Sequence, residues 1–280
     1  MLRHPGMLAV VAGALSGMAP TASAIAEATI EPRLSGGTSY YDLDLDGEVT
    51  VGDDSVDDIE FDDWLYFVGG GVTISFDRFF IDFSGQYSFD GDEDLNLDVV
   101  SGGVVVNDLA QDVDFDRFEA GIAVGYRITD HFAGYIGYRY ADVDFDGSGS
   151  LGAVGVDFST DFEQHGPLIG ASYAIPKTIL NGTLVLNGAV TYLNGDLENE
   201  LDADAGIDDV SFDIDGDAIG FNGGLSWAAP ISEQAKFVLG GDVSSYQFDD
   251  DDDETDFDEL IVRLRAEVRY SFDTSTFAGN

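Results

Sequence analysis

The stretch "ELIVRLRAEVRYSF", residues 259–272, alternates apolar and polar side chains almost without exception. Successive side chains of a β-strand point to opposite faces of the sheet. If this stretch is a strand, one of its faces carries Leu260, Val262, Leu264, Ala266, Val268, Tyr270 and Phe272. The other face carries Ile261, Arg263, Arg265, Glu267, Arg269 and Ser271. The first face suits hydrocarbon and the second suits ions or water. The strand is therefore expected to separate an apolar medium from a polar one.

The same period-2 alternation recurs along the chain, and helical periodicity is almost absent. Ten segments are predicted as strands, and the connections between them alternate between short and long. The short ones are "FDRF", "ITDH", "IPKT" and "PISEQA", and the long ones cover 42–63, 90–116, 142–163, 196–217 and 249–259. The predicted strands are 28–41, 62–76, 79–90, 117–129, 131–143, 163–175, 178–194, 218–229, 235–248 and 258–272.

The charge of the chain is gathered in the long connections. The formal net charge is -44, from 55 acidic and 11 basic residues, and the five long connections hold 45 of the acids and no Lys or Arg. Contacts to phosphates require basic side chains, so this balance excludes nucleic acid as a partner. Cations are the natural counterpart of such a surface.

An even number of strands, an apolar face with aromatic residues near its ends, and long connections on one side only are typical of a transmembrane β-barrel. Hydrocarbon cannot satisfy the unpaired backbone groups of a sheet edge, so the sheet must close. No later apolar run approaches the roughly 20 residues of a membrane-spanning helix. We predict an all-β, antiparallel, up-and-down transmembrane β-barrel of ten strands, with eight strands as the alternative.

The first residues indicate export. A short basic start at Arg3 and His4, the apolar run "MLAVVAGALSGMA", and the small residues Ala22, Ser23 and Ala24 predict a secretory signal peptide over residues 1–24. Residues 25–280 are then the barrel, with five acidic extracellular loops. The chain has no cysteine, which excludes disulfides and thiolate chemistry.

Over residues 28–272 the chain resembles the small outer-membrane β-barrel proteins of Gram-negative bacteria. The stretch 259–272 also resembles the C-terminal assembly signal of that class, with Tyr270 and Phe272 as its aromatic pair, although "DTSTFAGN" follows where such chains often stop. Ten strands resemble the omptin-sized barrels, and eight the opacity-type proteins. The resemblance implies a place in the cell outer membrane, with outer-membrane lipid, lipopolysaccharide and the assembly machinery as partners. We expect a monomer.

Charged residues on the polar face of the strands are predicted to form an ion-pair network that plugs the lumen. Arg263, Arg265 and Arg269 are expected to pair across it with Glu119, Asp82 or Asp242. The alternative is a narrow, porin-like, cation-selective channel lined by these groups. The predicted network is Arg33, Asp82, Glu119, Arg127, Arg139, Asp242, Arg263, Arg265, Glu267 and Arg269.

The stretch "DLDLDGEVTVGD", residues 42–53, resembles a calcium-binding EF-hand loop, with candidate ligands at Asp42, Asp44, Asp46 and Asp53. Leu43 and Leu45 make it equally a strand leaving the membrane. We therefore predict no single metal site and no cofactor, but diffuse binding of Ca²⁺ or Mg²⁺ by the acidic loops.

The candidates for catalysis are few. Omptin-type proteases use aspartates and an Asp/His pair, and after the signal peptide the chain has only His131 and His165. Glu163 stands two residues before His165, where a carboxylate can orient an imidazole as a general base. The Asp that precedes the His in that family is missing here. The sequence favours a structural or surface-interaction protein that is not an enzyme, with an omptin-like protease as a remote alternative.

Overall fold

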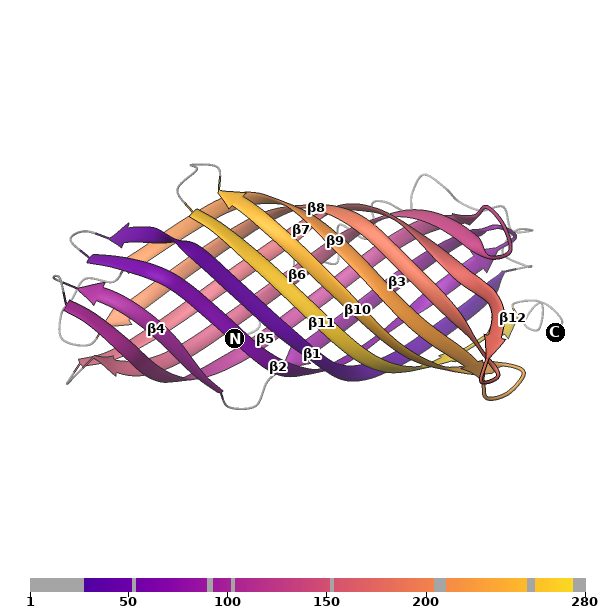
Figure 1. Ribbon diagram of the computed structural model, residues 1–280, viewed down its shortest axis with the longest axis horizontal. Helices are drawn as coiled ribbons and strands as arrows, with labels where there is room; N and C mark the ends of the chain where they lie inside the picture. Colours follow the sequence, from indigo (N-terminus) through magenta and orange to yellow (C-terminus); the bar gives the residue numbers. More distant parts are fainter. Residues whose placement is uncertain are drawn as a thin grey trace, which may run out of the picture.

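The computed structural model describes residues 28–273 except 52–53, 90–92, 102–103, 152–153, 204–209 and 251–254, and it describes side chains over 28–44, 62–89, 114–148, 159–198, 216–248 and 258–272. The described backbone is almost entirely β-strand, wound with a strong tilt around one long axis (Figure 1). Among the described residues there is no helix long and apolar enough to cross a membrane.

Ten barrel strands form the wall, and every neighbouring pair is antiparallel. β3 and β4 together make one of them, because both lie between β2 and β5; β12 likewise continues β11 beside β1. β1 pairs with β2 on one side and β11 on the other, which closes the barrel. The predicted fold class and the count of ten are confirmed. The strands are β1 (Thr29–Val51), β2 (Asp54–Phe76), β3 (Phe79–Phe89), β4 (Glu93–Ser101), β5 (Val104–Arg127), β6 (Phe132–Leu151), β7 (Val154–Ile179), β8 (Gly182–Ala203), β9 (Val210–Pro230), β10 (Ala235–Asp250), β11 (Thr255–Tyr270) and β12 (Phe272–Asp273).

The strands run much further than predicted at the end that carries the acidic residues, here called the acidic end. β1 continues to Val51 where an end near residue 41 was expected, and β7 begins at Val154 where residue 163 was expected. The prediction of five long loops was wrong for the backbone, because most of each acidic window belongs to a paired β-hairpin. A sheet can leave the membrane and stay paired when its inner face remains covered.

The opposite end, here called the turn end, carries four short connections: Asp77–Arg78, 128–131, Leu180–Asn181 and 231–234. Three of them lie where the sequence predicts them. The predicted turn "IPKT" was wrong, because residues 175–178 belong to β7 and the chain turns only at Leu180–Asn181. Leu180 and Asn181 both have positive φ, 50° and 63°, which is what a type I′ hairpin turn requires. β1 begins at this end, because Thr29 pairs with Ser75 of β2 and with Asp273 of β12. The short strand β12 lies at the same end (Figure 1).

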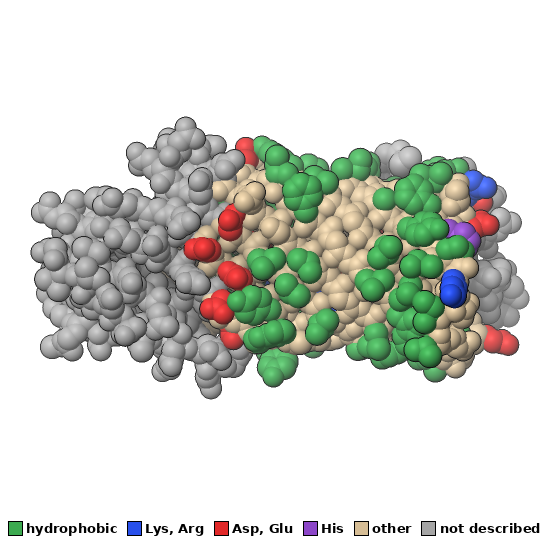
Figure 2. Space-filling view, viewed as in Figure 1, with side chains coloured by type: hydrophobic (Ala, Val, Ile, Leu, Met, Phe, Trp, Pro, Cys, Tyr) green, Lys and Arg blue, Asp and Glu red, His purple; other side chains and the backbone are tan. Residues whose placement is uncertain are grey.

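The outer surface matches the expected lipid-facing pattern. On the face that Figure 2 shows, apolar side chains gather in two bands across the barrel. Acidic side chains alone lie beyond one band, and acidic, basic and His side chains lie beyond the other. Exposed aromatic residues mark both bands, as in barrels that sit between two membrane interfaces. The band near the acidic end includes Trp64, Tyr66, Tyr87, Phe118, Tyr138, Tyr192 and Phe221, and the band near the turn end includes Phe79, Tyr126, Phe132, Tyr173, Tyr270 and Phe272.

Candidate functional site

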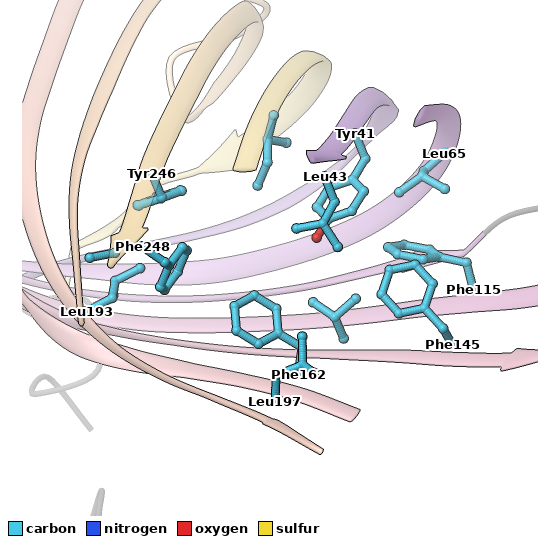
Figure 3. Packing of buried hydrophobic residues seen from close by; sticks show 13 residues of the cluster. Tyr41, Leu43, Leu65, Phe115, Phe145, Phe162, Leu193, Leu197, Tyr246 and Phe248 are labelled. Atoms are coloured by element: carbon cyan, nitrogen blue, oxygen red, sulfur yellow. The ribbon is translucent and has the colours of Figure 1, made fainter. Parts of the chain in front are cut away.

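The lumen at the acidic end is filled with apolar side chains. Thirteen buried residues from nine of the ten barrel strands point inward and meet there (Figure 3). Aromatic rings make the closest contacts, with centroids of Phe115 and Phe145 4.9 Å apart and those of Phe162 and Phe248 5.4 Å apart. We call this cluster the apolar plug: Tyr41, Leu43, Leu65, Phe115, Val143, Phe145, Phe162, Leu193, Leu197, Ala218, Tyr246, Phe248 and Ile261.

A charged layer lies beneath the apolar plug, further from the acidic end. Its centre is Glu119, whose carboxylate faces three guanidinium groups. The Nε atom of Arg117 lies 2.8 Å from it, and Nη2 of Arg139 lies 3.5 Å from it. Arg263 also donates a hydrogen bond to Glu119 and lies 3.4 Å from a carboxylate oxygen of Asp242. The single carboxylate of Glu119 is therefore shared by three guanidinium groups.

Two members of this layer, Arg117 and Glu259, are absent from the network predicted from the sequence. They form an ion pair whose side chains are both almost completely buried, and Gln164 donates a second hydrogen bond to Glu259 at 3.0 Å. In the sequence, Glu259 is the last residue of the acidic window 249–259. Its position in the alternation identifies it as inward-facing, because it lies two residues before Ile261 and therefore on the same face of the strand as Ile261, Arg263 and Arg265.

The rest of the predicted network is arranged closer to the turn end. Arg33 forms an ion pair with Asp82 at 2.6 Å, and its Nε lies 3.9 Å from Glu267. Arg265 lies 3.9 Å from Asp242. Arg269 was expected to pair with Glu119, Asp82 or Asp242, but it contacts Glu267 on its own strand and Glu31 on β1. Arg127 donates to the Ser75 hydroxyl at 3.0 Å and to the main chain of Asp77.

The lumen contains two polar cavities between these groups. The one nearer the turn end has a volume of about 450 Å³ and includes Glu31, Arg127 and Lys236 in its wall. The second, of about 410 Å³, lies deeper and reaches Glu119 and Arg139. Both are lined by Asp82 and Arg269, so they are neighbours along the axis. We call the two together the vestibule.

The most exposed charged side chains of the lumen lie toward the turn end, although Glu31 and Glu267 there are only 17% and 3% exposed. The Lys236 side chain is 49% exposed, and Arg269 and Arg265 are 30% and 33% exposed. Further in, Arg263 is 10% exposed and Glu259 is fully buried. The vestibule is thus open at the turn end and closed by the apolar plug at the other.

On the outside of the barrel, carboxylates follow directly after the acidic-end aromatic band. The register sets acid opposite acid on neighbouring strands, and the five acidic windows contain no Lys or Arg. Like charges directly opposite one another on a sheet are destabilising. We call these residues the carboxylate belt; its cross-strand pairs include Asp42 with Asp62, Asp116 with Asp144, Asp144 with Asp161, Asp142 with Glu163, Glu163 with Asp196, and Asp161 with Glu198.

The belt is densest on β6 and β7. Carboxylate oxygens of Asp142, Asp144 and Asp161 all lie within 4.8 Å of one another. Partial burial, a hydrogen bond with Asp161 and the negative charge of that neighbour raise the pKa of Asp144 to about 7. At β1 and β2, partial burial and the charge of Asp62 raise the pKa of Asp42. These groups are spaced closely enough for one divalent cation to contact several of them.

The stretch that resembles an EF-hand is a strand. Asp42 and Asp44 lie on β1 with their Cα atoms opposite Asp62 and Glu60 of β2, and the backbone of Asp46 continues the same strand. Asp53 lies outside the described residues. A calcium loop curls around its ion, whereas a strand spaces alternate side chains about 6.6 Å apart. The backbone therefore does not form the loop, and Asp42 belongs to the carboxylate belt.

The two histidines lie apart from the lumen. His165 is exposed on the outer surface of β7, where its ring packs against Tyr138 with centroids 6.2 Å apart. Glu163 is exposed on the same outer face, while Gln164 between them points inward to Glu259. His131 lies in the short connection 128–131 at the turn end.

Several solved outer-membrane β-barrels are similar to this fold. The outer membrane protease OmpT from Escherichia coli matches with a TM-score of 0.60 and 12% identity, over 87% of this chain and 97% of the other. The translocator domain of the autotransporter NalP from Neisseria meningitidis matches with a TM-score of 0.47 and 11% identity, over 95% and 93%. The Pseudomonas putida toluene transporter TodX matches with a TM-score of 0.36 and 10% identity, over 90% of each chain.

Comparison with protein-family models and with curated protein sequences gives no match. At 12% identity and below, the structural likeness concerns the fold alone. The chain therefore has the fold of the outer-membrane β-barrels, and its role is inferred from its own residues.

Proposed function

We propose that this protein is an integral outer-membrane barrel whose acidic end lies outside the cell and binds divalent cations along the carboxylate belt. The observation that carries the proposal is the register, which sets carboxylate opposite carboxylate directly above the aromatic band. Such a surface is held together more easily when Ca²⁺ or Mg²⁺ lies between the strands. The same ions would bridge the belt to the phosphates of lipopolysaccharide, which the bare carboxylates would repel.

The test is a titration of the refolded protein with Ca²⁺ or Mg²⁺ at fixed ionic strength, read as thermal midpoint and as hydrogen exchange of β6 and β7. We expect both cations to raise the midpoint and slow the exchange. Asp144→Asn combined with Asp161→Asn should reduce the response. The matched control is Asp130→Asn with Glu233→Gln, which removes two exposed acids at the turn end. If both double variants respond like the natural protein, the belt does not bind the ions.

A small cation-selective channel is the alternative that the carboxylates suggest, since they would concentrate cations at a mouth. The apolar plug argues against it, because buried side chains from nine barrel strands occupy the lumen at that end. Recording from planar bilayers decides between the two, and a reproducible unit conductance would favour the channel.

Omptin-like proteolysis has less support. The likeness to OmpT concerns the fold, and Glu163 and His165 both lie on the outer surface of β7 beside the aromatic band. This position leaves them away from the lumen, with no described nucleophile or cofactor motif beside them. A structural or surface-interaction role therefore remains the proposal.

A further inference from the structure

The deeper cavity of the vestibule is rich in arginine although the chain as a whole is strongly acidic. Five guanidinium groups and three carboxylates line it. The chain as a whole carries 55 acidic and 11 basic residues, so this excess of cations is local. The lining cations are Arg33, Arg139, Arg263, Arg265 and Arg269, and the lining carboxylates are Asp82, Glu119 and Glu267.

Three of these arginines, Arg139, Arg263 and Arg265, retain donors that the described residues do not satisfy. Arg139 is 9% exposed, and neither of its terminal nitrogens has a hydrogen-bond acceptor among the described residues. Its guanidinium lies over the ring of Tyr246, 4.6 Å from the centroid, and shares Glu119 with two other arginines. Arg265 lies 3.9 Å from Asp242, and its Nε has no acceptor among the described residues either.

A buried guanidinium with unused donors is costly unless an acceptor reaches it. Planar guanidinium groups match the two oxygens of a carboxylate or phosphate, and they bind such groups in a bidentate manner. We propose that the deeper cavity binds a small soluble oxyanion, whose carboxylate or phosphate group is held by Arg139 and Arg265. The volume of about 410 Å³ is sufficient for such a molecule.

The route to the site fits this ligand. The vestibule is open at the turn end, where the basic side chains Arg127 and Lys236 line the outer cavity. Arg78 and Lys177 lie at the same end, together with Asp77, Asp130 and Glu233. The outer cavity itself is lined by three cations, Arg127, Lys236 and Arg269, and two carboxylates, Glu31 and Asp82. An anion that enters this cavity therefore meets a small excess of positive charge, whereas the carboxylate belt and the apolar plug exclude it at the acidic end. The ligand therefore reaches the site from the compartment on the turn-end side of the membrane.

The experiment is calorimetric titration of the refolded protein with inorganic phosphate at constant ionic strength, repeated with succinate as a dicarboxylate. Binding of either anion is expected in the natural protein. Arg265→Gln should weaken it by about tenfold or more, the equivalent of one charge-assisted hydrogen bond. Lys177→Gln, which removes one positive charge outside the lumen, should leave the affinity unchanged.

Arg139→Gln should also weaken binding, and heat-modifiable migration on a gel checks that each variant is folded. Should Arg139→Gln fail to fold, Arg265→Gln still tests the site, because its side chain is one third exposed and less tightly packed. The proposal is overturned if neither phosphate nor succinate binds the natural protein. It is equally overturned if Arg265→Gln binds as tightly as the natural protein, or if Lys177→Gln weakens binding to the same extent.

Discussion

Arg117 donates a hydrogen bond to Glu259 across the lumen, although 142 positions separate the two residues in the chain. Arg117 lies on β5 and Glu259 on β11, which are not neighbours in the sheet. Gln164 from β7 donates to the same carboxylate. The pair therefore connects strands that backbone hydrogen bonds do not connect, and it does so in a fully buried position.

Glu259→Gln should reduce the free energy of unfolding by about 3 kcal/mol, because the charge of Arg117 would stay buried without its main partner. The lower end of the usual range is expected, since Glu119 still lies 2.8 Å from Arg117. The measurement is the urea midpoint of the protein refolded into lipid vesicles. Lys236→Gln is the control, because Lys236 pairs with Glu31 at 2.9 Å in an exposed position. An effect of at most about 1 kcal/mol is expected there. Equal losses would contradict a special role for the buried pair.

Gly220→Ala should destabilise the barrel by about 1–3 kcal/mol. A Cβ at this position would lie 2.0 Å from the ring of Tyr246, which is fully buried and supports the guanidinium of Arg139. Gly223 on the same strand is the matched control, since no atom lies within 4 Å of a Cβ built there. Thermal midpoints of the two variants should separate clearly. A harmless Gly220→Ala would mean that Tyr246 can move aside, and the packing around Arg139 would then need revision.

Stability of the acidic end should fall as the pH rises from about 4 to about 7. Asp144 has a raised pKa of about 7 in the folded protein, so over this range the folded state holds a proton that the unfolded state has released. The stabilising contribution is complete at pH values below about 4 and is lost as Asp144 ionises. The measurement is the hydrogen-exchange protection factor of β6 and β7 amides at pH 5 and pH 8, in which each rate is referred to the intrinsic exchange rate at that pH.

Asp144→Asn should remove most of this pH dependence, while Asp130→Asn in a turn-end connection should leave it intact. Divalent cations should restore protection at pH 8, since they replace the proton as a neutralising group. Protection factors that are the same at both pH values in the natural protein would argue against a raised pKa at Asp144.

The natural protein should conduct no ions in a planar bilayer, because the apolar plug fills the lumen. Phe162→Ala combined with Phe248→Ala removes two fully buried rings that pack against each other, and this variant should show discrete openings. Phe118→Ala, which removes an exposed ring on the outer surface, is the control and should remain silent. Openings in the natural protein would show that the plug is not a seal.

Much of the barrel can be predicted from the sequence because membrane and lumen impose opposite demands on alternate residues. In "ELIVRLRAEVRYSF" the inward arginines and outward leucines follow directly from period 2. The pairing of Arg269 could not be predicted in the same way, since distances across a closed lumen depend on the tilt and register of all the strands. Glu31 and Glu267 happen to lie nearer to it than Glu119.

The length of the strands at the acidic end cannot be predicted from polarity. "YYDLDLD" at residues 40–46 alternates as regularly as the membrane segments do, but its aspartates also fit the start of a loop. Outside the membrane the two faces exchange their chemistry: Tyr41 and Leu43 point into the lumen, and Asp42 and Asp44 point to water. The two-residue period continues although the polar and apolar faces change places. Alternation therefore predicts the length of a strand better than the polarity of its residues does.

The continuation of paired strands beyond the aromatic band has a consequence for anything that meets this end of the protein. A protease needs a segment that can leave its own structure and extend through the active-site cleft, and a backbone paired on both sides does not do so readily. A binding partner, in turn, meets a backbone that is already ordered, so little conformational entropy is lost when the complex forms. The described hairpins of the acidic end combine the exposure of surface loops with the rigidity of a barrel wall.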